Sequence, residues 1–153
     1  MITIKPYLPE YKNRLLDIFK SNMPLYFAEE EFPLFSAFLE KDVFVKHYAV
    51  VFKDNILIGC GGIALNEPGK YTTEPHVIMT WGMVHHDYHK QNFGKALLAF
   101  RISEAGKIYP GIKIALGTTQ HTYRFFEKYG FKTVCFEKDH WAKGLDLYQM
   151  ELI

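Results

Sequence analysis

The stretch 83–98, MVHHDYHKQNFGKALL, decides the fold, because the end of a strand leads through a polar loop straight into an apolar helix. The start of a helix points several unpaired backbone N–H groups, with partial positive charge behind them, at whatever the preceding loop holds. The natural occupant of such a junction is a phosphate. The sequence therefore predicts an anion-binding site where this helix begins, around Gly94.

Helical and strand patterns alternate on both sides of that junction. One-sided apolar spacing predicts a helix over 11–19, with Pro9 and Glu10 in its first turn, and a second helix that begins at Pro33. The β-rich runs 47–52 and 56–65 are joined by turn residues, which indicates a hairpin. The other expected elements are residues from Asp42 onward that lead into the strands, a loop over 66–75, strands over 77–84, 112–116, 131–136 and 145–152, a helix from Phe93 that ends before Pro110, and a helix over 122–129.

Length and composition favour one folded domain over 1–153. The chain has 153 residues, of which 48% are hydrophobic and 16% aromatic, and this excludes a disordered protein. The formal net charge is +1, so there is no electrostatic case for a nucleic-acid or membrane partner. The N-terminus has no apolar run typical of a signal peptide, and the longest apolar stretch, 56–65, is about half a bilayer span. A cytoplasmic location is expected.

The two cysteines each lie in an apolar run that is typical of a strand. Cys60 and Cys135 are therefore expected to be buried, reduced thiols rather than parts of a disulfide framework. A bridge between the two is the alternative.

Two later segments add to the junction before Gly94. Residues 125–131, FFEKYGF, are typical of a short helix stopped by glycine before a strand, and residues 144–150, GLDLYQM, of a last strand. Taken in order, the three segments resemble the GCN5-related N-acetyltransferase (GNAT) superfamily, which transfers acyl groups from coenzyme A. The loop motif of that superfamily falls on His89, Asn92 and Gly94. Gly94 matches strictly, and Asn92 can replace glycine because asparagine adopts the left-handed conformation readily.

The resemblance covers essentially the whole chain and implies an α/β fold. The expected architecture is a single-domain GNAT-like mixed central sheet of about seven strands flanked by about four helices. The expected order is β-α-α-β-β-β-α-β-α-β-β. Two splayed strands of this sheet would form an acyl-CoA cleft.

The resemblance also implies where acetyl-CoA would bind as the acyl-donor cosubstrate, with no metal. The loop and first helical turn would hold the pyrophosphate, through His89, Lys90, Gln91, Asn92, Phe93, Gly94 and Lys95. Met83 and Val84 would offer main-chain hydrogen bonds to the pantetheine arm, and the Gly82 N–H would face the thioester oxygen. Thr119 stands where many relatives have a coenzyme-contacting Asn, and Thr122 and Phe126 follow on the same helix.

The implied chemistry is attack of an amine on a thioester, and an alkyl ammonium, with a pKa of roughly 10, must first lose a proton. Relatives often use a helix tyrosine as the acid, but this chain has Phe126 there, and the strand positions of the usual base hold Ile78 and Thr80. Water relays are expected instead. The nearest candidate bases are His85, which is favoured, then Glu67 and His76, and the weaker candidates for the acid are Tyr123 and Tyr129.

Three further features each have two interpretations. His85, His86, Asp87 and His89 are spaced like metal ligands, but the resemblance makes them loop residues beside a phosphate. The acidic run 29–31 could attract a cationic acceptor, but carboxylates also suit an exposed helix start, and a solvated face is favoured. Tyr26, Phe27 and Trp81 could line an acceptor pocket, but aromatic residues at such positions more often belong to the core.

The function that these patterns predict is acetyl-CoA-dependent acetyl transfer to a primary amine of a small molecule or a peptide. The alternative is an acyl-CoA-binding regulatory or sensor domain with little or no turnover, which Phe126 motivates. A structural α/β domain or another acyl-group transferase is the third hypothesis. In the superfamily the acceptor pocket comes from the first two helices and the loop between the last strands, here 21–40 and 137–144. A homodimer is the commonest soluble assembly and stays open.

Overall fold

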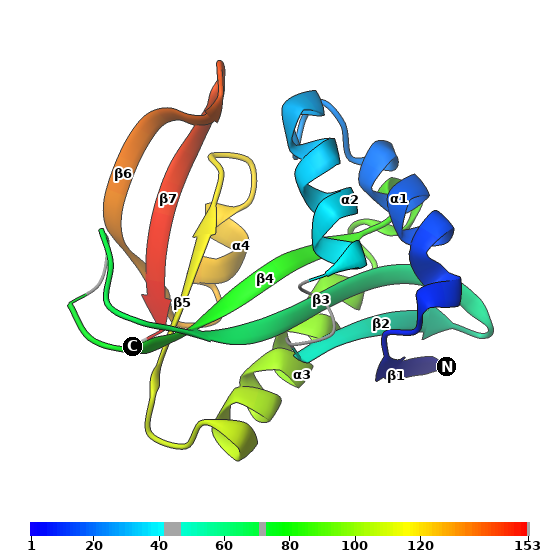
Figure 1. Cartoon of the computed structure of the whole chain (residues 1–153), viewed down its shortest axis with the longest axis horizontal. Helices are drawn as coiled ribbons and strands as arrows, with labels where there is room; N and C mark the ends of the chain where they lie inside the picture. The colour runs from blue at the N-terminus through cyan, green and yellow to red at the C-terminus, as the bar shows by residue number, and fades with distance from the viewer. Residues whose placement is uncertain (42–46, 71–72, 153) are drawn as a thin grey trace.

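The computed structural model describes residues 1–41, 47–70 and 73–152 and contains one mixed sheet (Figure 1). The sheet has seven strands in the order β1-β2-β3-β4-β5-β7-β6. The strands are β1 (Ile2–Pro6), β2 (His47–Lys53), β3 (Ile56–Asn66), β4 (His76–Val84), β5 (Lys113–Thr118), β6 (Phe131–Ala142) and β7 (Leu145–Leu152). The helices are α1 (Lys12–Ser21), α2 (Phe32–Glu40), α3 (Phe93–Ile108) and α4 (Tyr123–Glu127), with short 3-10 turns η1 (Pro9–Tyr11), η2 (Glu29–Glu31) and η4 (His86–Tyr88). This confirms the predicted fold and element order.

Helices cover both faces of the sheet (Figure 1). α1 and α2 pack on one face, where Phe19 is completely buried and its ring lies 4.7 Å from that of Phe27 and 5.4 Å from that of Phe35. α3 packs on the other face, where Leu97 and Leu98 are buried. Burial of this much aromatic and aliphatic surface stabilises the two layers by the hydrophobic effect. None of the described helices is both long and apolar enough to cross a membrane.

β4 departs from a regular strand at a bulge. The register with β3 shifts between Cys60 and Gly62, and Trp81 has a left-handed φ of 36°. Two residues of β4, Trp81 and Gly82, therefore stand opposite Gly61 alone. Such a bulge bends the strand and redirects its peptide groups.

β4 and β5 form the parallel pair of the described sheet and stay together over three residue pairs, the last of which joins Ile78 and Ala115. Beyond Ile78 the two strands diverge, so the predicted splay is confirmed. The bulge at Gly82 lies in the diverging part of β4 and is exposed. The fold thus opens a wedge directly beside the irregular peptide groups.

Several expected boundaries are wrong. The segment 137–144 is mostly strand, because β6 continues to Ala142 and turns into β7 through Gly144, whose φ is 87°. α4 ends at Glu127, ahead of Gly130, whose φ of 96° stops a helix. The expectation for Asp42 onward lies partly outside the described residues, as does part of the loop over 66–75.

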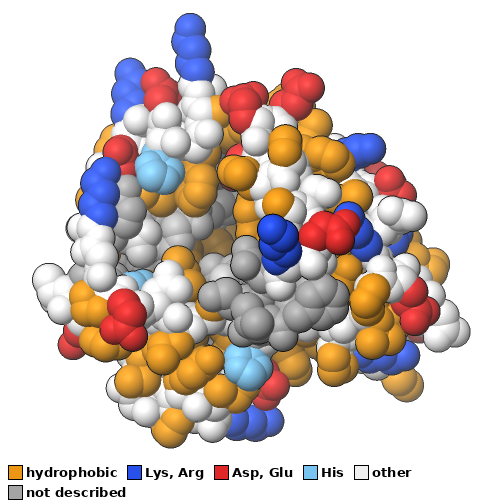
Figure 2. Space-filling view, in the orientation of Figure 1, with side chains coloured by type: hydrophobic (Ala, Val, Ile, Leu, Met, Phe, Trp, Pro, Cys, Tyr) orange, Lys and Arg blue, Asp and Glu red, His pale blue; other side chains and the backbone are white. Residues whose placement is uncertain are grey.

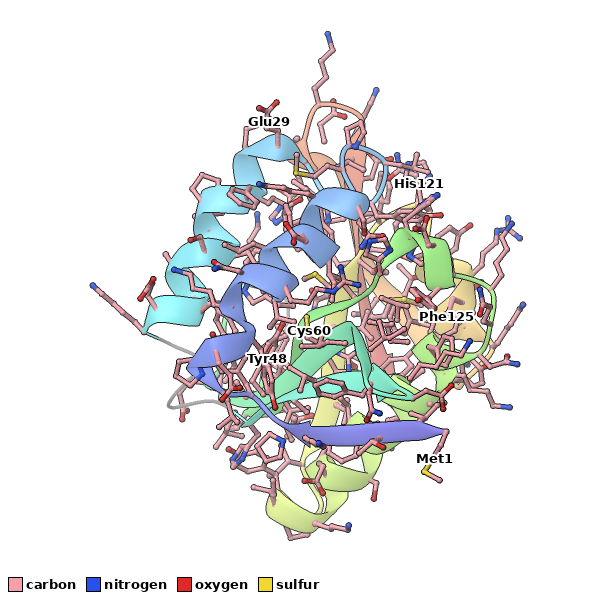
Figure 3. The ribbon with its side chains drawn as sticks, turned by 90° about the vertical axis from the view of Figure 1, so that its right-hand side faces the viewer. Met1, Glu29, Tyr48, Cys60, His121 and Phe125 are labelled. Carbon is pink, nitrogen blue, oxygen red and sulfur yellow. The ribbon has the colours of Figure 1, made fainter. Side chains whose placement is uncertain are left out.

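The cysteines are both free, and only one of them is buried as expected. Cys135 is half-buried on β6, whereas Cys60 is completely buried in the middle of the sheet, near Tyr48 (Figure 3). Burial raises the pKa of Cys60 to about 12, which the hydrogen bond with Tyr48 and the charge of Arg101 only partly offset.

We expect a thiol reagent at pH 8 to label one cysteine in the native protein and two after unfolding. A thiol with a pKa of about 12 is roughly one part in 10,000 thiolate at that pH, and the thiolate is the nucleophile. Intact-mass measurement after maleimide treatment counts the labels. A Cys135→Ser variant should take up none while folded, and rapid labelling of that variant would contradict the burial of Cys60.

Candidate functional site

A cleft of about 1000 Å³ opens where β4 and β5 diverge. Its walls are β4 with the start of α3, the β5–α4 connection with α4, the segment between α1 and α2, and the end of β6. Figure 2 shows the surface hollowed between the β6–β7 hairpin and α2, with hydrophobic side chains at the bottom. The cleft brings together residues as distant in the sequence as Asn22 and Gln149.

The loop before α3 ends in a left-handed residue at the wall of this cleft. Asn92 has φ 70° and ψ 9° at the N-cap of α3, so its predicted conformation is confirmed. The Ala96 N–H donates the first helical hydrogen bond, to the Asn92 carbonyl at 3.1 Å. The N–H groups of Phe93, Gly94 and Lys95 precede that bond and donate none within the described part of the chain. This helix start is therefore able to bind an anion.

Positive charge surrounds the same end of the cleft. Lys90, Lys95 and Lys128 line it from the loop, from α3 and from the end of α4, and all three are exposed. Exposed ammonium groups attract a diphosphate at little desolvation cost. The residues present therefore fit the pyrophosphate of coenzyme A.

The Val84 carbonyl is already occupied by hydrogen bonds within the protein. It accepts hydrogen bonds from Asn22 Nδ2 at 3.0 Å and from His89 Nε2 at 2.8 Å, which uses both lone pairs. The His85 N–H donates to Ile58 on β3, and alternate residues of a strand point their N–H groups to the same side. The Met83 N–H therefore points to β3, and the Val84 N–H points to the cleft. Of the two residues predicted to bind the pantetheine arm through the main chain, Val84 is thus the one whose N–H could reach it.

Burial keeps the imidazole of His89 neutral. Burial lowers its pKa, as do the charges of the neighbouring His86, His85 and Lys90, while the bond to Val84 acts in the other direction. Neutral imidazole has one N–H, so the proton sits on Nε2. His89 therefore positions the end of β4 and adds no positive charge at neutral pH.

Most of the predicted site residues line the cleft, and four do not: Gln91, Phe93, His85 and the acid candidate Tyr123, whose ring stacks on that of Tyr148. Those that line it are Glu67, His76, Gly82, Met83, Val84, His89, Lys90, Asn92, Gly94, Lys95, Thr119, Thr122 and Phe126. Phe93 is instead buried between α3 and the sheet, and Gln91 donates to the Asp87 carbonyl at 3.3 Å. His85, the favoured base, accepts from the Asp87 N–H through Nδ1 at 3.1 Å and stands outside the lining.

The other two candidate bases lie at the far end of β4. His76 begins the strand, six residues before Gly82, and Glu67 directly follows Asn66, which pairs with His76. Six residues of strand span roughly 20 Å. Neither geometry supports proton transfer at Gly82 without a relay, so the base stays a prediction. Residues 1–41, 47–70 and 73–152 contain no group of three or more His, Cys, Asp or Glu side chains that could hold a metal ion.

Glu31 is a residue that sequence reasoning missed. The acidic run was expected to be a solvated face, and this is wrong for Glu31, which is 7% exposed and lines the cleft. Its Oε2 accepts the Ala28 N–H at 2.9 Å and closes the 3-10 turn before α2. Burial raises the pKa of Glu31, and the hydrogen bond from the Ala28 N–H and, more weakly, His140 across the cleft oppose that rise. A run of three glutamates ahead of Pro33 signals a helix start and says nothing about which one turns inward.

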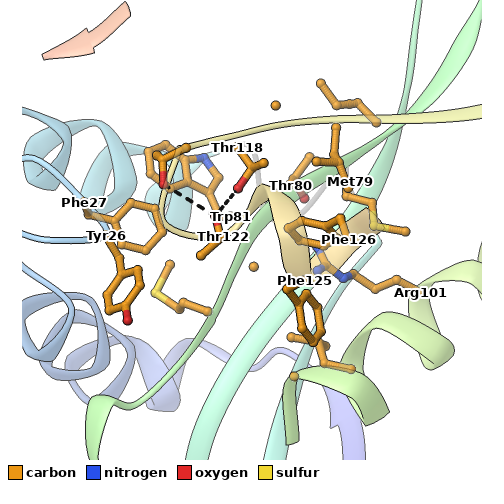
Figure 4. Close-up of a pocket in the computed structure, with 18 of the residues that line it drawn as sticks. Tyr26, Phe27, Met79, Thr80, Trp81, Arg101, Thr118, Thr122, Phe125 and Phe126 are labelled. Carbon is orange, nitrogen blue, oxygen red and sulfur yellow. Dashed lines mark hydrogen bonds between the residues drawn. The ribbon is translucent and has the colours of Figure 1, made fainter. Parts of the chain in front are cut away.

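The aromatic residues near Glu31 belong to the core and to the cleft at once. Trp81 lines the cleft, and its ring lies 5.2 Å from that of Phe35 in the α1–α2 cluster. Tyr26 lines it too, with His89 on one side at 5.2 Å and His121 on the other at 6.1 Å. Figure 4 shows Tyr26, Phe27 and Trp81 gathered on one side of the cleft. The core interpretation is thus confirmed for Phe27 and Trp81, and the acceptor pocket stays a prediction.

Arg101 was also missed. It projects from α3 into the cleft wall, is 6% exposed, and has neither an ion pair nor a hydrogen bond to any described residue (Figure 4). Burial lowers its pKa to about 10, and the nearby Tyr48 and Cys60 act in the other direction. It is still charged at neutral pH. The signal in the sequence was a single arginine within the apolar helix, seven residues after Gly94.

Orphaned polar atoms gather at the same place. The side-chain nitrogen or oxygen atoms that are buried without a partner, among the residues described, are Arg101 Nε and Thr80 Oγ1, and both residues line the cleft. A buried polar group without a partner costs about 1–3 kcal/mol, so such groups mark sites where a ligand or water completes the structure.

Comparison with known proteins agrees with this geometry. Residues 27–153 match the family model described as the acetyltransferase (GNAT) domain. NAA60 of Arabidopsis thaliana, solved with a bisubstrate analogue, is similar with a TM-score of 0.78 and 18% identity over 99% of this chain and 97% of that one. The ribosomal-protein-alanine N-acetyltransferase of Brucella melitensis gives 0.76 and 18% over 99% and 98%. YncA of Salmonella typhimurium, a putative acetyltransferase solved with acetyl-CoA, gives 0.74 and 17% over 99% and 93%.

The fold and the cleft define an acyltransferase of the GNAT type. With the family model matched over most of its length, this chain belongs to the GNAT acetyltransferase family. Comparison with curated protein sequences gives no match.

Proposed function

We propose that this protein transfers an acetyl group from acetyl-CoA directly to a primary amine of a small molecule or a peptide. The observation that carries the proposal is the free helix start at Gly94, which opens on the cleft beside three exposed lysines. The pyrophosphate would bind there, and the pantetheine arm would follow β4 past the Val84 N–H. Thr119 and Thr122, which contact each other at the β5–α4 turn, would meet the arm from the other wall.

The reacting thioester would then lie at the bulge. Gly82 is exposed there, and its N–H is the predicted donor to the carbonyl oxygen. A fixed backbone donor at a developing oxyanion lowers the barrier by about 3 kcal/mol in comparable enzymes. Holding donor and amine together in one cleft supplies much of the remaining rate enhancement.

The acceptor amine would enter on the side of Glu31 and Trp81. A buried carboxylate recognises an ammonium group by a charge-assisted hydrogen bond, and aromatic rings bind a cation through their faces. NAA60 and YncA were solved with a bisubstrate analogue and with acetyl-CoA, which supports a cleft of this kind for both substrates.

Calorimetry with acetyl-CoA, followed by mass detection of acetylated products across a panel of amines, tests this function. We expect saturable binding and at least one acetylated amine. A folded protein without acetyl-CoA binding would contradict the proposal.

The alternative is a binding domain that keeps the cleft without turnover. Phe126 favours it, because its ring packs against those of Phe125 and Phe131 and has no proton to give. Release of free thiol in the presence of amines separates the two, since a sensor would bind acetyl-CoA and release none.

We expect Glu31→Gln to raise the KM for the amine by at least about tenfold with a smaller effect on kcat, because loss of one member of a buried charge pair costs about 2 kcal/mol or more. The amide oxygen can still accept the Ala28 N–H, so stability should not fall. Steady-state kinetics at saturating acetyl-CoA measure the change. Glu29→Gln, two residues earlier and exposed, is the matched control. An equal effect of both variants would show that only overall charge matters.

A further inference from the structure

A buried positive charge without a counter-ion lies in the wall of the cleft. The groups that face the Arg101 guanidinium are Tyr48 and Cys60, and both are neutral at pH 7 because burial raises their pKa values. Burying an ion costs several kcal/mol unless a partner of opposite charge offsets it. No described residue offers such a partner, so the structure holds an uncompensated cation where a substrate would lie.

Gly61 and Gly82 leave the space that the Arg101 side chain occupies. A Cβ on Gly61 would come within 3.4 Å of Arg101 Cδ, and a Cβ on Gly82 would come within 2.6, 2.7 and 2.9 Å of Nη2, Nη1 and Cζ. The two Nη atoms are the nearest, so the tip of the guanidinium fills the space that a side chain at Gly82 would occupy. The bulge of β4 therefore brings Gly82, an exposed residue that lines the cleft, into direct contact with a cation.

The position of Arg101 on α3 places it on the donor side of the cleft. Gly94, Leu97 and Arg101 follow one another at spacings of three and four residues, which puts them on one helix face, and all three line the cleft. Seven residues of helix span roughly 10 Å from the phosphate-binding start. Glu31 and Trp81 approach from the sheet face covered by α1 and α2, so the acceptor side is the opposite one.

The chain lacks an acid on that donor side. Phe126 lines the cleft from α4, and in Figure 4 the Arg101 side chain reaches from α3 toward the same part of the cleft. A thiolate, whose conjugate acid has a pKa of roughly 8.5, leaves readily without full protonation when a cation is close. The charge of a fixed guanidinium can thus stabilise the leaving thiolate, which a proton donor would stabilise by protonating it.

We propose that Arg101 stabilises the leaving thiolate of the acyl donor, a role that rests on the proposed acetyl transfer. The amine nitrogen forms a bond to the acyl carbon, the C–S bond breaks, and its electron pair goes to sulfur, which is then held by the guanidinium. The amine proton passes to water or a base. The thiolate takes a proton from solvent, and the products are the amide and coenzyme A as the thiol.

The proposal is tested without turnover by proton release on binding of coenzyme A. Calorimetry at pH 7.5 in buffers of different ionisation enthalpy measures it. With a thiol pKa lowered below about 7, the parent protein should release more than about half a proton per coenzyme A bound. Arg101→Met should release almost none and should bind coenzyme A with a Kd raised by about four- to tenfold, the loss that the lowered thiol pKa implies at this pH. Desulfo-CoA, which has no sulfur, should release no proton from either protein. Equal release from parent and Arg101→Met would overturn the proposal.

Single-turnover rates and thermal unfolding separate this role from a structural one. Arg101→Met should lower the rate by about 100-fold or more, and Arg101→Lys, which keeps the charge, should recover at least about tenfold of the loss. The Tm of Arg101→Met should equal or exceed that of the parent, because an unpaired buried charge is removed. Arg124→Met, at an exposed arginine outside the cleft, is the matched control.

A lower Tm with an unchanged rate would make Arg101 a structural residue and overturn the proposal. Different results would overturn the proposed acetyl transfer and the proposed role of Arg101. If the parent binds no coenzyme A, the proposed function itself is wrong. If the parent binds it and Arg101→Met behaves like the parent in rate and proton release, only the role of Arg101 is wrong.

Discussion

Gly94→Glu should abolish binding of acetyl-CoA by a protein that remains folded. The substitution puts a carboxylate at the helix start where the diphosphate would lie. Two like charges about 4 Å apart near a protein surface repel by about 4 kcal/mol, and each 1.4 kcal/mol is a factor of ten. We therefore expect the Kd to rise by at least about 100-fold in isothermal titration.

Two controls isolate the cause. Among the described residues, a Cβ on Gly94 would meet the Phe125 ring alone, at 3.6 Å from Cζ and 3.9 Å from Cε1. Both are ordinary contacts, so Gly94→Ala should fold normally and keep most of the affinity. Gly106→Glu adds the same charge to the same helix at an exposed position with nothing within 4 Å, and should bind like the parent. If Gly94→Glu binds as tightly as Gly106→Glu does, the phosphate site is elsewhere.

Gly62→Ala should unfold the protein or destabilise it by more than about 4 kcal/mol, the range of the most damaging substitutions. A Cβ on Gly62 would come within 2.2 Å of the His47 carbonyl oxygen and within 3.0 Å of Tyr48 Cα. Both obstacles are backbone atoms of β2 and cannot rotate away. The pairing of β2 with β3 must therefore be broken or displaced, and the bulge of β4 loses its support.

Urea unfolding of the purified variants measures the effect. Gly106→Ala makes the same chemical change inside a helix with open space around it, and should stabilise the protein by about 0.5–1 kcal/mol. The two variants should thus differ in sign. A Gly62→Ala protein as stable as the parent would contradict the tight approach of β2 to β3.

The order of elements was predictable because it depends on local chemistry. Apolar spacing predicts α1 and α2, an apolar stretch after a polar loop predicts α3, turn residues join β2 to β3, and Gly130 indicates that a helix stops shortly before it. Asn92 was predictable too, since few residues other than glycine and asparagine turn the chain in the left-handed conformation before a helix. The boundary of β6 was not, because an irregular hairpin with a left-handed Asp139 resembles a loop in sequence.

The chemistry at the centre of the cleft was less predictable. His85 was favoured as a base because it is close to Gly82 in sequence, but the 3-10 turn η4 leads it away from the cleft. Glu31 and Arg101 come from segments distant from the motif and become important only when the sheet brings them to β4. Sequence proximity does not report which side chain turns inward when three elements meet.

The sequence by itself determined the fold family and the helix start that suits a phosphate, because backbone donors depend on local conformation and hence on residues such as Asn92 and Gly94. Only the tertiary structure decided which charges are buried. Desolvation depends on everything packed around a group, and this is why Glu31 and Arg101, ordinary charged residues in the sequence, become a buried carboxylate and an unpaired cation on opposite sides of one cleft.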